Sequence, residues 1–427
     1  MNFLTKCNLA KPTNTQEFIV MNILKISLAN IKKKKSTSFL SALLLTLGIG
    51  MISLLLLLNK QLDDQFKKNI KGIDMVVGAK GSPLQLILSS IYQIDAPTGN
   101  IPLSEVNQLK RNPFVKTVIP LAMGDNYQSF RIVGTNKTYP EHFEVSILSG
   151  KLFEKPMDVT IGDKVARTTG LKIGDTFASS HGLDEAGDAH ESHKYLVTGI
   201  FKPTETVIDQ LVLTSLESIW EVHQHEEEGQ SNSIELLAHE GHDEQEELQI
   251  TSALIKFRSP MGLMALPRQV NSTTSMQAAL PSIEINRLFS LMGVGIDTLR
   301  ALAIIIILIA GLSVLISLYN SLRERKYEMA LMLSMGATRQ TLFMMLLLEG
   351  LMLAILGYFC GIALSRVGLF LFSNAAEQDF HYSLYQFKLL TEEVYLFVGA
   401  VGVGFIAALL PSLGIFRLNI SRTLAEE

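Results

Sequence analysis

Residues Phe39 to Leu58 have the sequence FLSALLLTLGIGMISLLLLL and include no charged side chain. About 20 helical residues are needed to cross about 30 Å of hydrocarbon, because a helix rises about 1.5 Å per residue. Inside a bilayer every backbone N–H and C=O must be bonded within the protein, which favours a helix. The run exceeds the apolar core of a signal peptide, about 7–15 residues, and no small-residue cleavage site follows it. It therefore predicts a retained membrane helix.

Three more apolar runs lie near the C-terminus, at residues 301–320, 342–365 and 394–416, and their only charged residue is Glu349. We therefore predict four membrane helices. The 427-residue chain is 48% hydrophobic and 18% charged, which excludes an ordinary soluble enzyme and a disordered protein. A net charge of −4 provides no basic field for nucleic acid, and the two cysteines allow neither a disulfide framework nor a CxxC site.

Basic residues near the apolar runs predict the orientation, because lysine and arginine concentrate on the cytosolic side. Lysines 32–35 precede the first run, and Arg323, Arg325 and Arg339 lie between the second and third. We therefore expect a multi-pass protein of the bacterial inner membrane with both termini in the cytosol. Met1 and Met21 remain alternative start residues.

The expected segments follow from these boundaries. They are a cytosolic N-terminal segment (1–38), helix 1 (39–58), an extracytoplasmic domain (59–300), helix 2 (301–320), a cytosolic segment (321–341), helix 3 (342–365), a short outer loop (366–393), helix 4 (394–416) and a cytosolic tail (417–427).

Small residues recur every four positions in three of the runs, and such spacing lets helix backbones approach closely. They are Ala42, Thr46 and Gly50; Gly357, Gly361 and Ser365; and Ala400, Gly404 and Ala408. We expect these stripes to form helix–helix contacts.

The extracytoplasmic segment has a different composition, with short strand-like runs separated by Gly, Pro, Asn and Asp. Four such runs begin at Thr117, Phe130, Tyr195 and Leu211. Residues 59–70 can extend the first membrane helix outward, and residues 281–298 can lead into the second. The prediction is an α+β domain on a helical stalk, inserted between helices 1 and 2.

An acidic, histidine-rich stretch at residues 221–247 stands out within this domain. It holds nine Glu, one Asp and four His, without Lys or Arg. Imidazole and carboxylate groups are suitable zinc ligands, but acidic runs are usually solvated loops, so both interpretations stay open. The candidate ligands are His190, His193, His223, His225, His239 and His242.

The cytosolic segment 321–341 has the pattern of an amphipathic helix with a break, in which Leu331, Met332 and Met335 can form an apolar face and Gly336 a turn. Glu349 follows about 10 Å into the third run, at about 1.5 Å per residue. An ionisable group at this depth faces protein or water. It serves either as a structural pairing group or in a mechanical or proton-carrying role.

The cytosolic segment and the outer segment together resemble the MacB-like and FtsX-like permeases of ABC transporters, which include the LolC and LolE subunits. The resemblance rests on Arg323, Arg325, Glu328, Gly336, Ala337 and Arg339, continues through Leu348-Glu349-Gly350, and includes Gly134, Gly150, Gly162, Gly174 and Gly199 in the outer segment. It implies that residues 59–300 form a MacB-like periplasmic core domain. It also implies that the six residues between 323 and 339 couple the chain to an ATPase.

No GxxxxGK[ST] motif is present, so the chain is not expected to be an enzyme or to hold a cofactor, apart from zinc in the metal interpretation. The resemblance implies a separate ATPase subunit in two copies that binds ATP-Mg. It also implies a second permease copy, in a homodimer or a heterodimer, and a periplasmic or lipoprotein partner.

Three hypotheses follow for the function. The chain moves or extracts an envelope substrate by mechanotransmission, handles metal through its histidines, or regulates an outer partner without transport.

Overall fold

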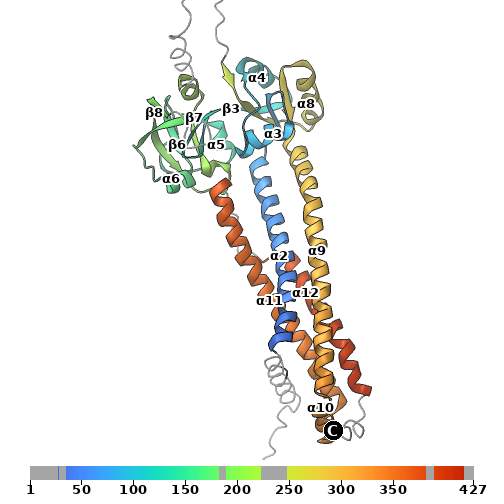
Figure 1. Cartoon of the computed structure of the whole chain (residues 1–427). Coiled ribbons are helices and arrows are strands. Elements are labelled where there is room, and N and C mark those ends of the chain that lie inside the picture. The colour runs from blue at the N-terminus through green and yellow to red at the C-terminus, as the bar shows by residue number, and fades with distance from the viewer. Residues whose placement is uncertain (1–26, 28–34, 182–188, 223–247, 381–388, 418–427) are drawn as a thin grey trace, which may run out of the picture. The chain divides into compact units, whose positions relative to one another are not determined.

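The structure, a computed structural model, describes residues 27, 35–181, 189–222, 248–380 and 389–417 (Figure 1). The chain divides into two compact units. One comprises residues 1–61 and 293–427, which we call the membrane unit, and the other comprises residues 62–292, which we call the large domain. Two long helices, α2 (Lys35–Ile70) and α9 (Pro281–Glu324), contribute residues to both units.

In the part of the chain that the structure describes, four helices are long and apolar enough to cross a membrane. They are α2, α9, α11 (Arg339–Phe380) and α12 (Thr391–Leu413), with the short helix α10 (Lys326–Ser334) between α9 and α11 and a 3₁₀ turn η3 (Gly414–Arg417) after α12. The prediction of four membrane helices is therefore confirmed.

The predicted loop at residues 366–393 is wrong over most of its length. Helix α11 continues to Phe380 and α12 begins at Thr391. A helix does not end where its sequence stops being apolar, and residues 366–380 contain no proline to break it. Helix α9 likewise runs to Glu324, inside the segment expected to begin at residue 321.

Ten strands among the described residues of the large domain form one sheet, in the order β12-β1-β11-β3-β4-β9-β6-β8-β5, with β7 paired to both β3 and β8. Their bounds are β1 (Met75–Ala79), β3 (Val115–Tyr127), β4 (Phe130–Thr135), β5 (Ile147–Gly150), β6 (Asp158–Ile161), β7 (Thr176–His181), β8 (Ala189–Phe201), β9 (Leu211–Ser215), β11 (Ser252–Phe257) and β12 (Met276–Ala279). A short pair, β2 (Ile101–Pro102) and β10 (Gln249–Ile250), lies apart. All four predicted strand runs lie in strands.

The two halves of the sheet bury their side chains differently. In the β1 half, alternate residues face opposite sides, so Met75 and Val77 join one core and Val76 another. In the other half, β7 closes β3, β4, β9, β6 and β8 into a ring around a third core that includes Phe130 and Tyr195. Strand β3 belongs to both halves, because it pairs with β11 up to Leu121 and with β4 from Ala122.

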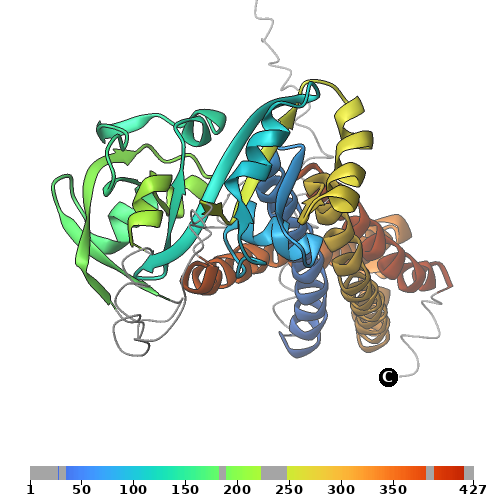
Figure 2. The same cartoon turned by 90° about the horizontal axis from the view of Figure 1, so that it is seen from above.

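Short helices cover the β1 half on both faces (Figure 2). Helices α4 (Leu103–Lys110) and α8 (Met261–Thr273) pack on one face, and α3 (Pro83–Ile87) with the π-helical turn η1 (Leu88–Tyr92) packs on the other. Other elements are α5 (Thr138–His142), α6 (Asp163–Thr169) and the 3₁₀ turn η2 (Val207–Gln210), and residues 216–222 are also helical. Because α2 ends at Ile70 and α9 begins at Pro281, both predicted stalk helices are present.

Candidate functional site

The expected coupling segment is a folded elbow between α9 and α11. Gly336 has φ +100°, a conformation that a side chain disfavours, and the Ala337 N–H donates to the Met332 carbonyl at 3.0 Å. This arrangement ends α10 and lets the chain reverse into α11. The predicted turn at Gly336 is therefore confirmed.

Polar contacts hold the elbow at both ends. Arg325 Nε donates to Glu328 Oε2 at 2.8 Å, within the first turn of α10. Arg339, the first residue of α11, donates from Nη1 to the carbonyl of Phe416 at 2.5 Å. Arg323 is exposed at the end of α9. The six residues of the family pattern therefore lie together in one elbow, although only these local roles are visible.

An exposed apolar stripe runs along the elbow. Tyr327, Leu331 and Met335 are four residues apart, so they share one face, and 42%, 44% and 79% of their surfaces are exposed. The predicted face included Met332, but that residue packs inward against the core around Met329, Leu342 and Ile415. Contiguous exposed apolar patches on proteins are often contact surfaces for another protein or for a membrane.

A buried polar cluster joins three membrane helices, and we call it the membrane cluster. Glu393, at the start of α12, is 1% exposed, and its Oε2 accepts from Arg366 Nη2 of α11 at 2.8 Å. Its Oε1 accepts from the Ser53 hydroxyl of α2 at 2.7 Å. The Ser53 and Ser365 hydroxyl oxygens lie 2.9 Å apart, and Tyr358 donates to the Glu393 carbonyl at 3.1 Å.

Sequence analysis missed the membrane cluster, although a signal was present. Arg366 directly follows the third apolar run and Glu393 directly precedes the fourth. In a helical hairpin the end of one helix and the start of the next lie at the same level. Opposite charges in these two positions therefore indicate an ion pair. The expected outer loop at residues 366–393 hid this signal, because it placed both residues outside the helices.

The small-residue stripes predicted from sequence do form helix contacts. A Cβ added at Gly361 of α11 would lie 2.9 Å from Ile49 Cγ2 and 3.1 Å from the Gly50 backbone of α2. A Cβ at Gly350 of α11 would lie 2.5 Å from the Ala408 Cβ of α12. These close approaches confirm the prediction, because they require glycine.

Glu349 lies in α11 with 3% of its surface exposed. This agrees with the expectation that an ionisable group at this depth faces protein. Burial is common to the structural, mechanical and proton-carrying roles, so Glu349 remains a candidate for each.

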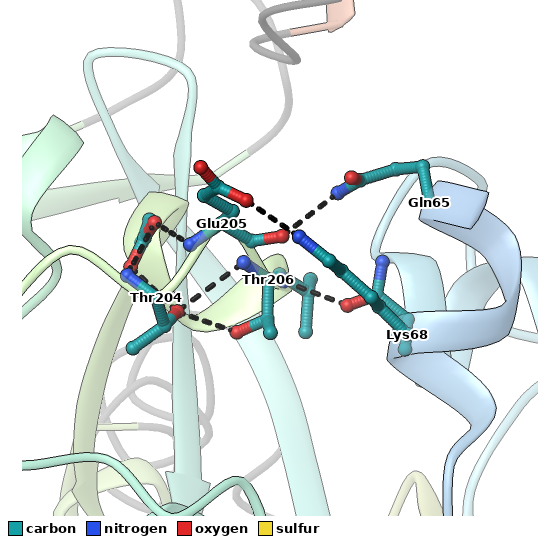
Figure 3. A network of polar contacts seen from close by, with 8 residues as sticks. Gln65, Lys68, Thr204, Glu205 and Thr206 are labelled. Carbon is teal, nitrogen blue, oxygen red and sulfur yellow. Dashed lines mark hydrogen bonds and ion pairs between the residues drawn. The ribbon is translucent and has the colours of Figure 1, made fainter. Parts of the chain in front are cut away.

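The end of α2 is held by the connection between β8 and β9 in what we call the stalk anchor (Figure 3). Lys68 Nζ lies 2.5 Å from Glu205 Oε2, and Gln65 Nε2 donates to the Glu205 carbonyl at 3.2 Å. Asn69 is fully buried, and its Oδ1 accepts from the Val207 N–H at 2.9 Å. The Asp209 carboxylate fixes this connection by accepting from the Thr204 and Glu205 N–H groups.

A histidine completes the stalk anchor. Nε2 of His142 lies 2.9 Å from the carbonyl oxygen of Lys71, which directly follows α2. Burial lowers the pKa of His142 and Lys256 lowers it further, whereas the bond to Lys71 and the charge of Asp74 act in the opposite direction. The neutral ring, with hydrogen on Nε2, therefore fits this position.

The predicted metal ligands fall largely outside the described residues. This holds for His223, His225, His239 and His242, whereas the backbone of His190 and His193 belongs to β8. Within the described ranges, no group of three or more His, Cys, Asp or Glu side chains is placed to hold a metal ion. The zinc hypothesis therefore stays a prediction.

Two family models match the chain. The MacB-like periplasmic core domain matches residues 38–252, and the FtsX-like permease C-terminal region matches residues 300–420. The chain belongs to the MacB/FtsX-like family of ABC transporter permeases. It is therefore a transporter component with a periplasmic domain, and membership implies an ABC ATPase as partner.

Two solved structures are similar to part of this permease. The periplasmic region of MacB from Actinobacillus actinomycetemcomitans is 11% identical, with a TM-score of 0.32, and the match covers 52% of this chain and 97% of that one. The extracellular domain of the noncanonic ABC-type transporter YknZ from Gram-positive bacteria is 13% identical, with a TM-score of 0.28, over 48% and 98%. No curated protein matches this chain.

Proposed function

We propose that this permease transmits the work of a separate ATPase to its periplasmic domain, and thereby moves or extracts an envelope substrate. The ATPase docks on the elbow from the cytosol, the side on which the excess of Lys and Arg favours both termini. Two ATPase subunits act on two permease copies. The permease itself carries out no catalysis.

The observation that supports this proposal best is the stripe of Tyr327, Leu331 and Met335. Its residues are exposed beside Arg323, Lys326 and Glu328, a charged setting that suits water better than lipid. A protein partner that covers the stripe gains the burial of these three side chains. Since α11 starts directly after the elbow, a push on the stripe reaches a membrane helix at once.

Loss of the ATPase from the purified complex tests this proposal. Met335→Asp places a charge in the stripe, and we expect at least about tenfold less ATPase to co-purify, since a lost contact of about 1.4 kcal/mol is tenfold in affinity. Met264→Asp is the matched control, because Met264 on α8 is also an exposed methionine, at 83%. Equal ATPase recovery from both variants and the unmodified chain would contradict the docking surface.

A further inference from the structure

The stalk anchor and the elbow are connected to different helices. The elbow joins α9 and α11 through the chain itself, whereas α2 has no such link. Helix α2 therefore follows a movement of the elbow only through side-by-side contacts, either with α11 or with α9, where the Ser41 and Ser313 hydroxyl oxygens lie 2.9 Å apart. Those contacts decide whether force applied at the elbow reaches the stalk anchor on α2.

The contacts between α2 and α11 are of two kinds. Gly50, Gly357 and Gly361 make close van der Waals contacts, each of which is individually weak. Ser53 adds directional bonds, because its hydroxyl faces both the Glu393 carboxylate and the Ser365 hydroxyl. Hydrogen bonds of this kind resist sliding along the helix axis.

The acceptor of the Ser53 bond is fixed to α11 and α12. Arg366 of α11 and the Leu390 N–H both donate to Glu393 Oε2, at 2.8 and 3.1 Å. Oε1 is thereby left for Ser53, and a charge-assisted bond of this kind is stronger than one between neutral groups. A displacement of the α11–α12 pair therefore pulls directly on α2 at this hydroxyl.

We propose that Ser53 is the positioning residue that passes movement of the α11–α12 pair to α2. Ser53, Lys68 and Asn69 all belong to the single helix α2 (Lys35–Ile70). Lys68 and Asn69 belong to the stalk anchor, where they contact Glu205 and Val207. The inference rests on the proposed function and adds the route by which the work is carried.

Hydrogen–deuterium exchange of the full permease with its ATPase in lipid nanodiscs tests this route, with and without ATP. The peptides to follow cover residues 62–70 and 202–211, where the stalk anchor lies. The variants are Ser53→Ala, which removes the hydroxyl, and Ser53→Thr, which keeps it. Ser412→Ala is the matched control, because Ser412 is a buried serine of α12 whose hydroxyl bonds the Leu409 carbonyl of its own helix.

In the unmodified complex, ATP should change exchange in both peptides. In Ser53→Ala the change should shrink about fivefold, the factor that about one hydrogen bond represents, while ATP hydrolysis continues. Ser53→Thr and Ser412→Ala should behave like the unmodified chain. If Ser53→Ala does not assemble, Ser53→Cys replaces it, because a thiol is only a weak donor to the Glu393 carboxylate.

The outcomes separate the two proposals. An unchanged ATP response in Ser53→Ala, or in Ser53→Cys where that variant replaces it, overturns the role of Ser53 and leaves the proposed function intact. An unmodified complex that hydrolyses ATP without any exchange change in the large domain overturns the proposed function itself.

Discussion

The membrane cluster and the stalk anchor hold the same helix in opposite surroundings. In the cluster, the Arg366 and Glu393 side chains are 12% and 1% exposed, whereas in the anchor Lys68 and Glu205 are 42% and 69% exposed. A buried pair costs several kcal/mol when one partner is lost, whereas an exposed pair contributes about 0–1 kcal/mol. Ion pairs of similar length therefore contribute differently to the free energy of unfolding. In the stalk anchor, the buried neutral Asn69 should contribute more stability than the charged pair.

Glu393→Gln should produce the largest effect. It replaces the buried Glu393 carboxylate that accepts from the largely buried Arg366 guanidinium, and breaking a buried ion pair costs about 3–5 kcal/mol. We expect a lower thermal unfolding midpoint in detergent, and a partial recovery in the double variant Arg366→Met with Glu393→Gln. If Glu393→Gln alone were as stable as the unmodified chain, the ion pair of the membrane cluster would contribute no more stability than that of the stalk anchor.

Gly361→Ala tests whether close packing supports the membrane cluster. The new Cβ would meet Ile49 and the Gly50 backbone of α2, so we expect about 1–3 kcal/mol of destabilisation. Gly402→Ala in α12 is the matched control, because its Cβ meets nothing within 4 Å and alanine favours the helix. Thermal unfolding of both variants measures the difference, and equal midpoints would show that α2 and α11 are not in tight contact.

Asn69→Ala should have the largest effect within the stalk anchor. It leaves the Val207 N–H buried without its acceptor, which costs about 1–3 kcal/mol. Gln65→Ala removes an exposed bond to the same connection and should change stability much less. Hydrogen–deuterium exchange at residues 205–210 measures both effects. A larger increase in Gln65→Ala than in Asn69→Ala would contradict the larger contribution expected of Asn69.

The membrane helices and four of the strands were predictable, because apolar length and strand composition are local properties of the sequence. The turn at Gly336 and the stripes around Gly361 and Gly404 were predictable for the same reason. The membrane cluster was not found, because it joins Ser53 to residues more than 300 positions away. The stalk anchor depends in the same way on the register that places Glu205 beside Lys68.

Glu205→Gln should change stability by only about 0–1 kcal/mol, because water screens the pair with Lys68. The remaining difference from the unmodified chain should disappear at about 1 M salt, where the screening length is about 3 Å. Unfolding of both proteins in low and high salt measures this. A larger effect that persists in high salt would show that the stalk anchor depends on its charges as the membrane cluster does.

The smallest effect should be a pH dependence confined to the stalk anchor. Burial lowers the pKa of His142 below its ordinary value of 6.5, so below that pH the unfolded anchor takes up a proton that the folded one resists. The contribution of His142 to stability is therefore complete above about pH 6.5 and is lost as the pH falls through its lower folded pKa.

Hydrogen–deuterium exchange at residues 62–71 should rise in acid more in the unmodified chain than in His142→Gln. Residues 45–55 of α2 contain no titratable side chain and serve as the internal reference. If both proteins respond equally to acid, the bond between His142 and Lys71 does not hold the end of α2.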